Sequence, residues 1–140
     1  MDQPYRFFDH TGDFGVELKA PDAGQALAAF ARSFLDLLTD APATVAEVGE
    51  REVELDGMDL ADLMVNLGNE LIFLFEVEGF LCARLEVEEV EEDYLAAVLH
   101  GEVFDPARHP IARPVKAVTH HGACAETTPD GVEARIIYDL

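Results

Sequence analysis

The stretch FGVELKAPDAGQALAAFARSFLDLLT, residues 14–39, decides the fold class of this 140-residue chain. Its first seven residues alternate between apolar and polar or small side chains, a period of two that predicts a half-buried strand. Pro21 ends that pattern, and Asp22 followed by Gln25 is typical of the start of a helix. Apolar residues then recur at helical spacing as far as Leu38, so the strand is followed by an amphipathic helix.

The rest of the chain predicts one more helix and several strands around this unit. Gly68 lies in the middle of the second predicted helix, which begins after Asp59, and indicates that another segment approaches this helix closely. The five acidic residues within 88–93 predict a solvated turn, and Thr128-Pro129-Asp130-Gly131 predicts the turn of a hairpin. The predicted elements are a short strand at 53–55, a helix that Asp59 caps, strands at 81–88 and 94–102, an ordered loop at 104–114, and strands at 115–127 and 132–139.

No linker, internal repeat or low-complexity tract divides the chain. We therefore expect residues 1–140 to form a single α+β domain of two layers, in which a mostly antiparallel or mixed β-sheet packs against two helices.

The charge of the chain is strongly acidic, with 29 acidic residues against nine basic ones and a formal net charge of −20. Such a field repels nucleic-acid phosphates and anionic membranes, so we expect neither strong independent nucleic-acid binding nor membrane association. No apolar run approaches the roughly 20 residues of a membrane span, and the first residues lack the pattern of a signal peptide. The expected location is the cytoplasm, where the two cysteines are free thiols.

Motifs for nucleotide cradling, zinc proteolysis and nucleophile-elbow hydrolysis do not occur in the sequence, so we predict no catalytic residue. The stretch FDHTGDFG, residues 8–15, places Asp9, His10 and Asp13 just before the first predicted strand. Such side chains commonly form the turn itself, because Asp and Thr bond to the nearby backbone. A function at this position requires partners from elsewhere in the chain.

The predicted hairpin supplies those partners. If Thr128 pairs with Gly131, paired residue numbers sum to about 259, which places His120 opposite Asp139, give or take a bulge residue. The same register places the last residue of the sequence opposite Thr119.

A divalent-cation site is one interpretation of this strand end. If the first strand is a neighbour of the last, Asp13, Asp139 and the main-chain carboxylate of Leu140 offer oxygen ligands of the kind that Ca²⁺ and Mg²⁺ prefer. The alternative is a solvated chain end without a ligand. Lys116, close to His120 and His121 in sequence, either binds phosphate or an acidic partner or is an ordinary surface lysine.

Six stretches of the sequence carry a resemblance to a known family. They are residues 8–15, 34–40, 69–80, 101–110 (GEVFDPARHP), 115–122 (VKAVTHHG) and 134–140 (ARIIYDL). Together, and in this order, they resemble the archease family over nearly the whole chain. The family usually has Tyr where His120 stands, and His120 beside the expected metal would alter its preference or add sensitivity to pH.

The resemblance implies a non-enzymatic partner of the RtcB-type RNA ligase, which joins RNA ends in tRNA splicing and RNA repair. Archeases are thought to promote the transfer of guanylate from GTP to a histidine of that ligase, so GTP and RNA are reached only through the ligase. The metal ligands of the family fall on Asp13, Asp139 and Leu140, with Ca²⁺ as the first expectation and Mg²⁺ or Mn²⁺ as alternatives. Asp9, His10, Lys116, His120 and His121 are expected around the metal or at the partner.

Two other classes of function stay open from the sequence. The first is a small phosphoester hydrolase that depends on a divalent metal held by Asp13 and Asp139. The second is a general chaperone-like adaptor, which would bind unrelated proteins whether or not a metal is present.

Overall fold

A computed structural model describes the backbone of residues 4–10 and 13–140, and the side chains of these residues except those of His10 and Asp13. The described part contains two helices, seven strands and one turn of 3₁₀ helix, so the expected α+β class is confirmed. The elements are β1 (Tyr5–His10), β2 (Asp13–Ala20), α1 (Ala23–Leu38), the 3₁₀ turn Pro42–Thr44, β3 (Gly49–Asp56), α2 (Leu60–Glu78), β4 (Phe80–Glu91), β5 (Tyr94–Val103), β6 (Ala117–Thr128) and β7 (Gly131–Asp139).

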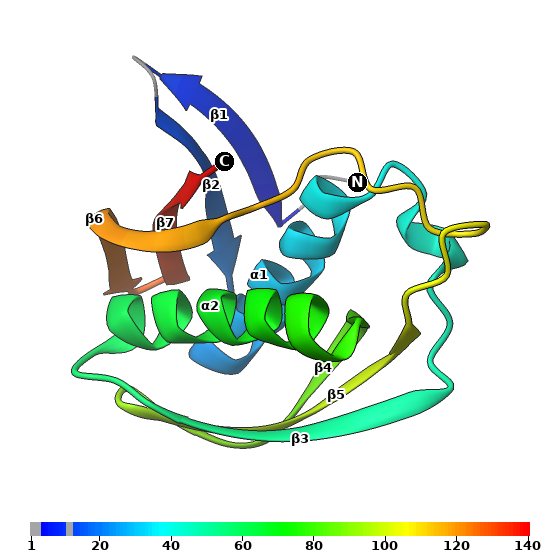
Figure 1. Cartoon of the computed structure of the whole chain (residues 1–140). Coiled ribbons are helices and arrows are strands. Elements are labelled where there is room, and N and C mark those ends of the chain that lie inside the picture. The colour runs from blue at the N-terminus through cyan, green and yellow to red at the C-terminus, as the bar shows by residue number, and fades with distance from the viewer. Residues whose placement is uncertain (1–3, 11–12) are drawn as a thin grey trace.

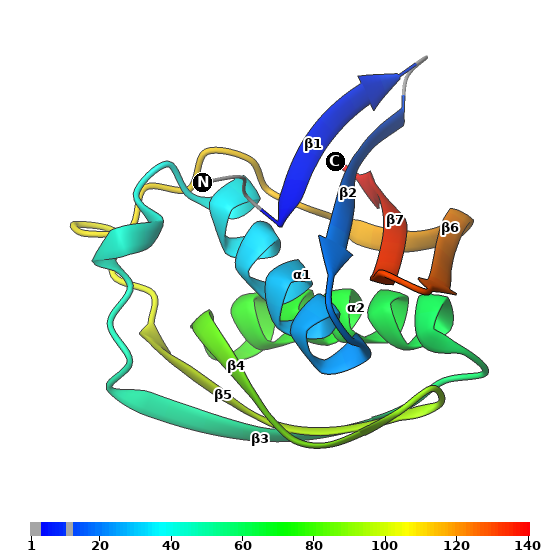
Figure 2. The ribbon, with the colours of Figure 1, turned by 180° about the vertical axis from the view of Figure 1, so that it is seen from behind.

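The strands form two antiparallel sheets, where we had expected one. The four-stranded sheet has the order β1-β2-β7-β6, and the three-stranded sheet has the order β3-β5-β4. Both helices lie between the two sheets (Figures 1 and 2). Helix α1 contacts β4 and β2, and α2 contacts β6 and β4, so one apolar core serves both sheets.

The helix boundaries follow the predicted caps. The Asp22 carboxylate accepts the N–H of Gln25 at 2.8 Å, and the Asp59 carboxylate accepts the N–H of Asp62 at 2.9 Å. Each cap satisfies an N–H group that has no partner inside its helix. Helix α2 ends at Gly79, whose φ of 68° is the left-handed conformation that glycine adopts readily. In the described residues no helix is long and apolar enough to cross a membrane.

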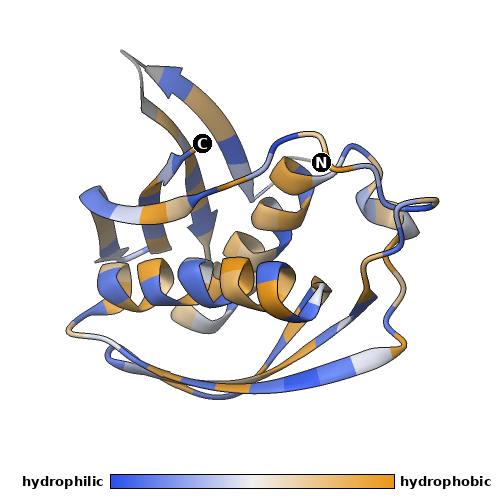
Figure 3. Ribbon diagram, in the orientation of Figure 1, coloured by the Kyte–Doolittle hydropathy of each residue, from blue (hydrophilic) through white to orange (hydrophobic). Residues whose placement is uncertain are grey.

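Because Gly68 has no side chain, β6 and α1 approach α2 closely at this position, as its place in the helix predicted. A Cβ at Gly68 would lie 2.5 Å from Val118 Cγ2 and 3.1 Å from Phe30 Cζ. Apolar residues recur along both helices and on the strands of both sheets (Figure 3). The buried ones form a single core cluster.

Two expectations about the strands are wrong. Strand β1 was not predicted, because the adjacent Phe7 and Phe8 break the alternation expected of a strand. The acidic residues 88–91 lie on β4, and only residues 92–93 form the turn to β5. Register shifts in β4 allow this exposed acidic end to stay paired with β5.

Candidate metal centre

The metal hypothesis depended on one condition, that the strand after Asp13 lies beside the last strand. The structure meets this condition, because β2 and β7 are paired. Phe14 pairs with Tyr138, and the pairing continues to Ala20 with Val132. Asp13 comes just before Phe14 in β2, and Asp139 comes just after Tyr138 in β7. In antiparallel strands one further step of this register brings Asp13 beside Asp139.

Strand β6 holds the other side of the β7 end. Ala117 pairs with Asp139, and the N–H of Lys116 donates to the main-chain oxygen of Asp139 at 2.8 Å. The Asp139 side chain is exposed, and Leu140 is 42% exposed. The end of β7 is therefore fixed by its backbone on both sides while its carboxylate faces solvent.

The position of His120 corrects the predicted register. The hairpin begins as expected, from Thr128 with Gly131 to Cys124 with Arg135. The pairing then shifts, so that residues 120–123 stand opposite Ile136 alone and Ala117, not His120, pairs with Asp139. Gly122 has a φ of 72° within this wide bulge, a conformation that few other residues adopt.

His120 instead contacts the start of α2. Its Nε2 lies 2.7 Å from Asp62 Oδ1, and the same carboxylate accepts the N–H of Met58 at 2.9 Å. The Met58 hydrogen bond and, next, that of His120 hold the pKa of Asp62 below its ordinary value. His120 is therefore directed to Asp62 and does not stand opposite Asp139. The expected effect of His120 on the choice of metal has no geometric basis.

The other predicted residues lie at or near the same end of the four-stranded sheet. Asp9 is exposed and pairs with Phe14, while His10 pairs with Asp13 at the end of the β1–β2 hairpin. The Lys116 side chain is exposed, and His121 lies in the bulge, where its N–H donates to Thr119 Oγ1 at 3.1 Å. The side chains of His10 and Asp13 are outside the described part of the chain.

Asn69 is a positioning residue that the sequence did not reveal. Its side-chain amide exchanges two hydrogen bonds with the backbone of Val118, two residues after Lys116. A polar residue on the buried side of an amphipathic helix is the signal that could have identified it.

The donors at this strand end are all of one chemical kind. Carboxylate oxygens from neighbouring strands suit a hard cation such as Ca²⁺, Mg²⁺ or Mn²⁺ rather than a soft one. Among the described side chains, which do not include that of Asp13, no three His, Cys, Asp or Glu residues form a cluster suited to a metal. The fit therefore rests on the β2–β7 register and on the exposed Asp139 carboxylate.

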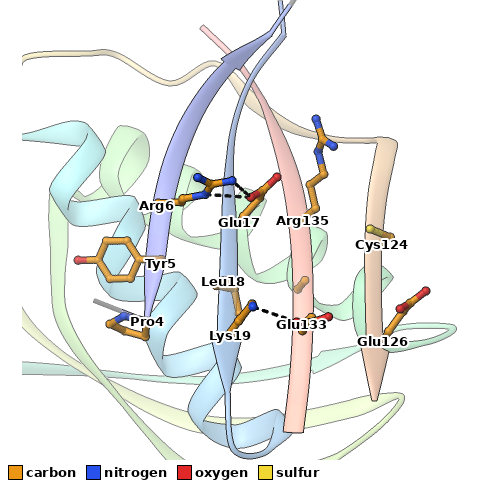
Figure 4. Close-up of a pocket in the computed structure, with 11 residues that line it drawn as sticks. Pro4, Tyr5, Arg6, Glu17, Leu18, Lys19, Cys124, Glu126, Glu133 and Arg135 are labelled. Atoms are coloured by element: carbon orange, nitrogen blue, oxygen red, sulfur yellow. Dashed lines mark hydrogen bonds and ion pairs between the residues drawn. The ribbon is translucent and has the colours of Figure 1, made fainter. Parts of the chain in front are cut away.

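A separate groove of about 600 Å³ crosses the outer face of the four-stranded sheet (Figure 4). Arg6 pairs with Glu17 at 2.9 Å and Lys19 pairs with Glu133 at 3.2 Å, so most of its charges are already matched. Arg135 stacks on the Phe8 ring, with its Cζ 4.3 Å from the ring centroid. The groove contains none of the predicted site residues.

The sequence of this two-sheet α+β domain matches a known protein family. Residues 5–140 match the model of the archease protein family (MTH1598/TM1083). A protein archease from Methanopyrus kandleri is 33% identical over 140 residues, covering 98% of this chain and 99% of that protein. One from Methanosarcina acetivorans is also 33% identical, covering 97% and 95%. The chain belongs to the archease family.

Two solved structures share the fold. The solution structure of protein 1598 from Methanobacterium thermoautotrophicum has a TM-score of 0.77 at 24% identity, covering 99% of this chain and 100% of that one. The crystal structure of a Thermotoga maritima protein, described as an archease and possible chaperone, has a TM-score of 0.63 at 17% identity, covering 100% and 98%. At these identities the likeness concerns the fold.

Proposed function

We propose that this chain is a non-enzymatic accessory protein of an RtcB-type RNA ligase, which it supports in tRNA splicing and RNA repair. Membership of the archease family supports the class of function. The observation that supports the site is the β2–β7 register, which pairs Phe14 with Tyr138, so that one further step of the same register would set Asp13 beside Asp139.

Asp13, Asp139 and the main-chain carboxylate of Leu140 are the proposed ligands of one divalent cation, with Ca²⁺ first and Mg²⁺ or Mn²⁺ as alternatives. Like charges held on adjacent strands repel each other unless a cation compensates them, which favours binding. When bound, the cation offsets phosphate charge at the end of the sheet.

The chain's own residues position this end of the sheet against the partner. Backbone pairing of Tyr138 with Phe14 on β2 and of Asp139 with Ala117 on β6 fixes the direction of β7, and the Asn69 contacts to Val118 fix β6 beside it. A cation held at this exposed strand end suits an accessory role, because transfer of guanylate to a ligase histidine requires the triphosphate to be held in line. GTP and RNA are then bound by the ligase, not by this acidic chain.

Ligation with limiting ligase tests the proposal. With an RtcB-type ligase, GTP, a divalent metal and cleaved RNA, this protein should raise the number of sealed ends per ligase molecule and the fraction of guanylylated ligase. The Asp13→Asn, Asp139→Asn double variant should lose that stimulation.

The matched control is Glu126→Gln with Asp130→Asn, which removes two charges from the opposite end of the same sheet. It should stimulate as well as the wild type. Full stimulation by the Asp13, Asp139 variant would refute the site, and phosphoester hydrolysis by the purified protein alone would favour the hydrolase alternative.

A further inference from the structure

The outer face of the three-stranded sheet has nothing packed on it within the described part of the chain (Figures 1 and 2). The inner face meets the helices through Leu95, Ala97 and Leu99 of β5, which are at most 1% exposed. The residues that alternate with them along β5 are Tyr94, Ala96, Val98 and His100, which therefore project to the outer side.

Acidic residues flank this central strand on both sides. On β3, Glu50, Glu52, Glu54 and Asp56 are exposed and pair with the four outward residues of β5. On β4, Glu86, Glu89 and Glu91 pair with Val98, Ala96 and Tyr94, and Arg84, opposite His100, ends this row. We call this surface, from β3 across β5 to β4, the acidic face.

The centre of the acidic face is apolar. Ala96 and Val98 are half-buried between the two acidic rows, and no charged side chain of β5 separates them. Val48, just before β3, is 79% exposed, and its N–H donates to Gly101 O at 3.1 Å at the end of β5. The face thus combines a narrow apolar strip with carboxylates along both margins.

The ends of the strip fix the nearest carboxylates in place. Tyr94 donates its hydroxyl to Glu54 at 2.6 Å, which raises the pKa of Tyr94 to about 12. His100 Nε2 lies 2.8 Å from Glu86 Oε1, and this hydrogen bond holds the pKa of Glu86 below its ordinary value. The acidic rows are therefore partly ordered before any partner arrives.

The middle of the acidic face lacks countercharge. Glu52 and Glu89 form no ion pair with any residue that the structure describes, and the guanidinium of Arg84 is bound to Glu47 at 2.8 Å. Alternate residues of a strand are about 6.7 Å apart, less than the screening length of about 8 Å at physiological salt. The carboxylates within each row therefore repel one another, and a cationic partner would relieve that repulsion.

We propose that the acidic face is a docking surface for a lysine- or arginine-rich segment of another protein, lying along β5. The two rows stand about two strand spacings, roughly 9.6 Å, apart, so long basic side chains of one segment reach both. Small Ala96 and Val98 let the backbone of that segment come close. A second copy of this chain, a nucleic acid or an anionic membrane would bring more negative charge and be repelled.

This inference does not depend on the ligase or on the metal, because the acidic face and the β7 end belong to different sheets. An octalysine peptide is a suitable probe, added to the full-length protein in EDTA so that no divalent cation contributes. We expect its binding to shift the backbone amide resonances of residues 94–100, and to weaken as salt rises from about 50 to about 200 mM.

Two charge-matched variants locate the binding. Glu52→Gln, Glu54→Gln, Glu86→Gln should weaken octalysine binding by about tenfold, as expected for three partly exposed ion pairs lost together. Glu126→Gln, Asp130→Asn, Glu133→Gln removes the same charge from the other sheet and should change affinity by less than about twofold. Equal weakening in both variants, or amide shifts spread over both sheets, would overturn the proposal, since the peptide would then only sense net charge.

Discussion

Asn69 and Val118 exchange two hydrogen bonds: Asn69 Nδ2 donates to Val118 O at 3.0 Å, and the Val118 N–H donates to Asn69 Oδ1 at 2.9 Å. One side chain of α2 thus takes the place of a neighbouring strand for the first residues of β6. Lys116, two residues earlier, in turn bonds the main chain of Asp139. The packing of α2 is linked in this way to the end of β7.

Replacing Asn69 by Ala should lower the free energy of unfolding by about 1–3 kcal/mol, because two hydrogen bonds are lost and two backbone groups of Val118 lose their partners. Urea unfolding measures this change. Asn66→Ala is the matched control, since Asn66 makes one side-chain bond, to Asp56 O at 2.8 Å, on a different segment. A smaller loss for Asn69→Ala than for Asn66→Ala would contradict the importance of the Val118 contact.

Gly68→Ala should also lower the free energy of unfolding. Overpacking costs about 1–3 kcal/mol, and the better helix propensity of Ala offsets about 1 kcal/mol of that cost. The added Cβ would lie 2.5 Å from Val118 Cγ2. The double variant Gly68→Ala, Val118→Ala should recover part of the loss, because the obstructing methyl groups are gone. Thermal unfolding of the two single variants and the double variant measures the coupling, and simple additivity would show that the contact is not as close as described.

Tyr138→Phe should leave stability unchanged or raise it slightly. The Tyr138 ring stacks on Phe30 with centroids 6.2 Å apart. Its hydroxyl is buried beside Ser33, whose own hydroxyl donates to Phe30 O, and it forms no hydrogen bond of ordinary geometry with a described residue. Removing a buried polar group that has no partner relieves its desolvation cost. A loss of more than about 1 kcal/mol in urea unfolding would mean that the hydroxyl has a partner.

Glu102 should make stability depend on pH. Its carboxylate accepts the N–H of Ala46 and a guanidinium N–H of Arg108, and these bonds, the first above all, hold its pKa below the ordinary value of 4.5. A carboxyl whose pKa is lower in the folded state stabilises the fold above about pH 4.5, and that contribution is lost as the pH falls through the lowered value.

The difference in unfolding free energy between the wild type and Glu102→Gln isolates this contribution. The overall acidity of the chain affects both proteins alike, so it cancels in the difference. We expect the wild type to be the more stable at pH 7 and the gap to narrow as the pH falls below about 4.5. A gap that is constant from pH 7 to pH 3 would show that the Glu102 contacts do not depend on its charge.

The sequence predicted the fold class and both helix caps because each depends on local chemistry. Asp22 and Asp59 bond to residues three positions ahead, and hydrophobic periodicity is a property of short windows. The division into two sheets depends on how distant strands pair, which no local pattern records. Strand β1 shows the same limit, since β2 and not its own alternation holds it in place.

The register predicted for the β6–β7 hairpin is correct near the turn and wrong near the candidate site. Counting outward from the hairpin turn gave the correct pairs as far as Cys124 with Arg135, since the turn sets the first pairs. Residues 120–123 then form a bulge wider than the single residue allowed for, and every later pair moves by three positions. The pairing of β2 with β7 was stated only as a condition, and the structure supplies it.

Metal binding by the β7 end gives the last prediction. In calorimetric titrations with Ca²⁺, Asp13→Asn, Asp139→Asn and a form extended beyond Leu140 by two glycines should each bind about tenfold more weakly than the wild type, because each loses or displaces one charged oxygen ligand.

His120→Ala is the informative control for this titration. The predicted register would place His120 opposite Asp139, whereas the structure pairs Ala117 there and directs His120 to Asp62. Its Ca²⁺ affinity should therefore equal that of the wild type, while the start of α2 loses one contact. Equal affinity in all the variants would show that Asp13, Asp139 and Leu140 do not bind the metal. Weaker binding by His120→Ala alone would show that His120 lies at the metal, which would contradict the register described for β6 and β7.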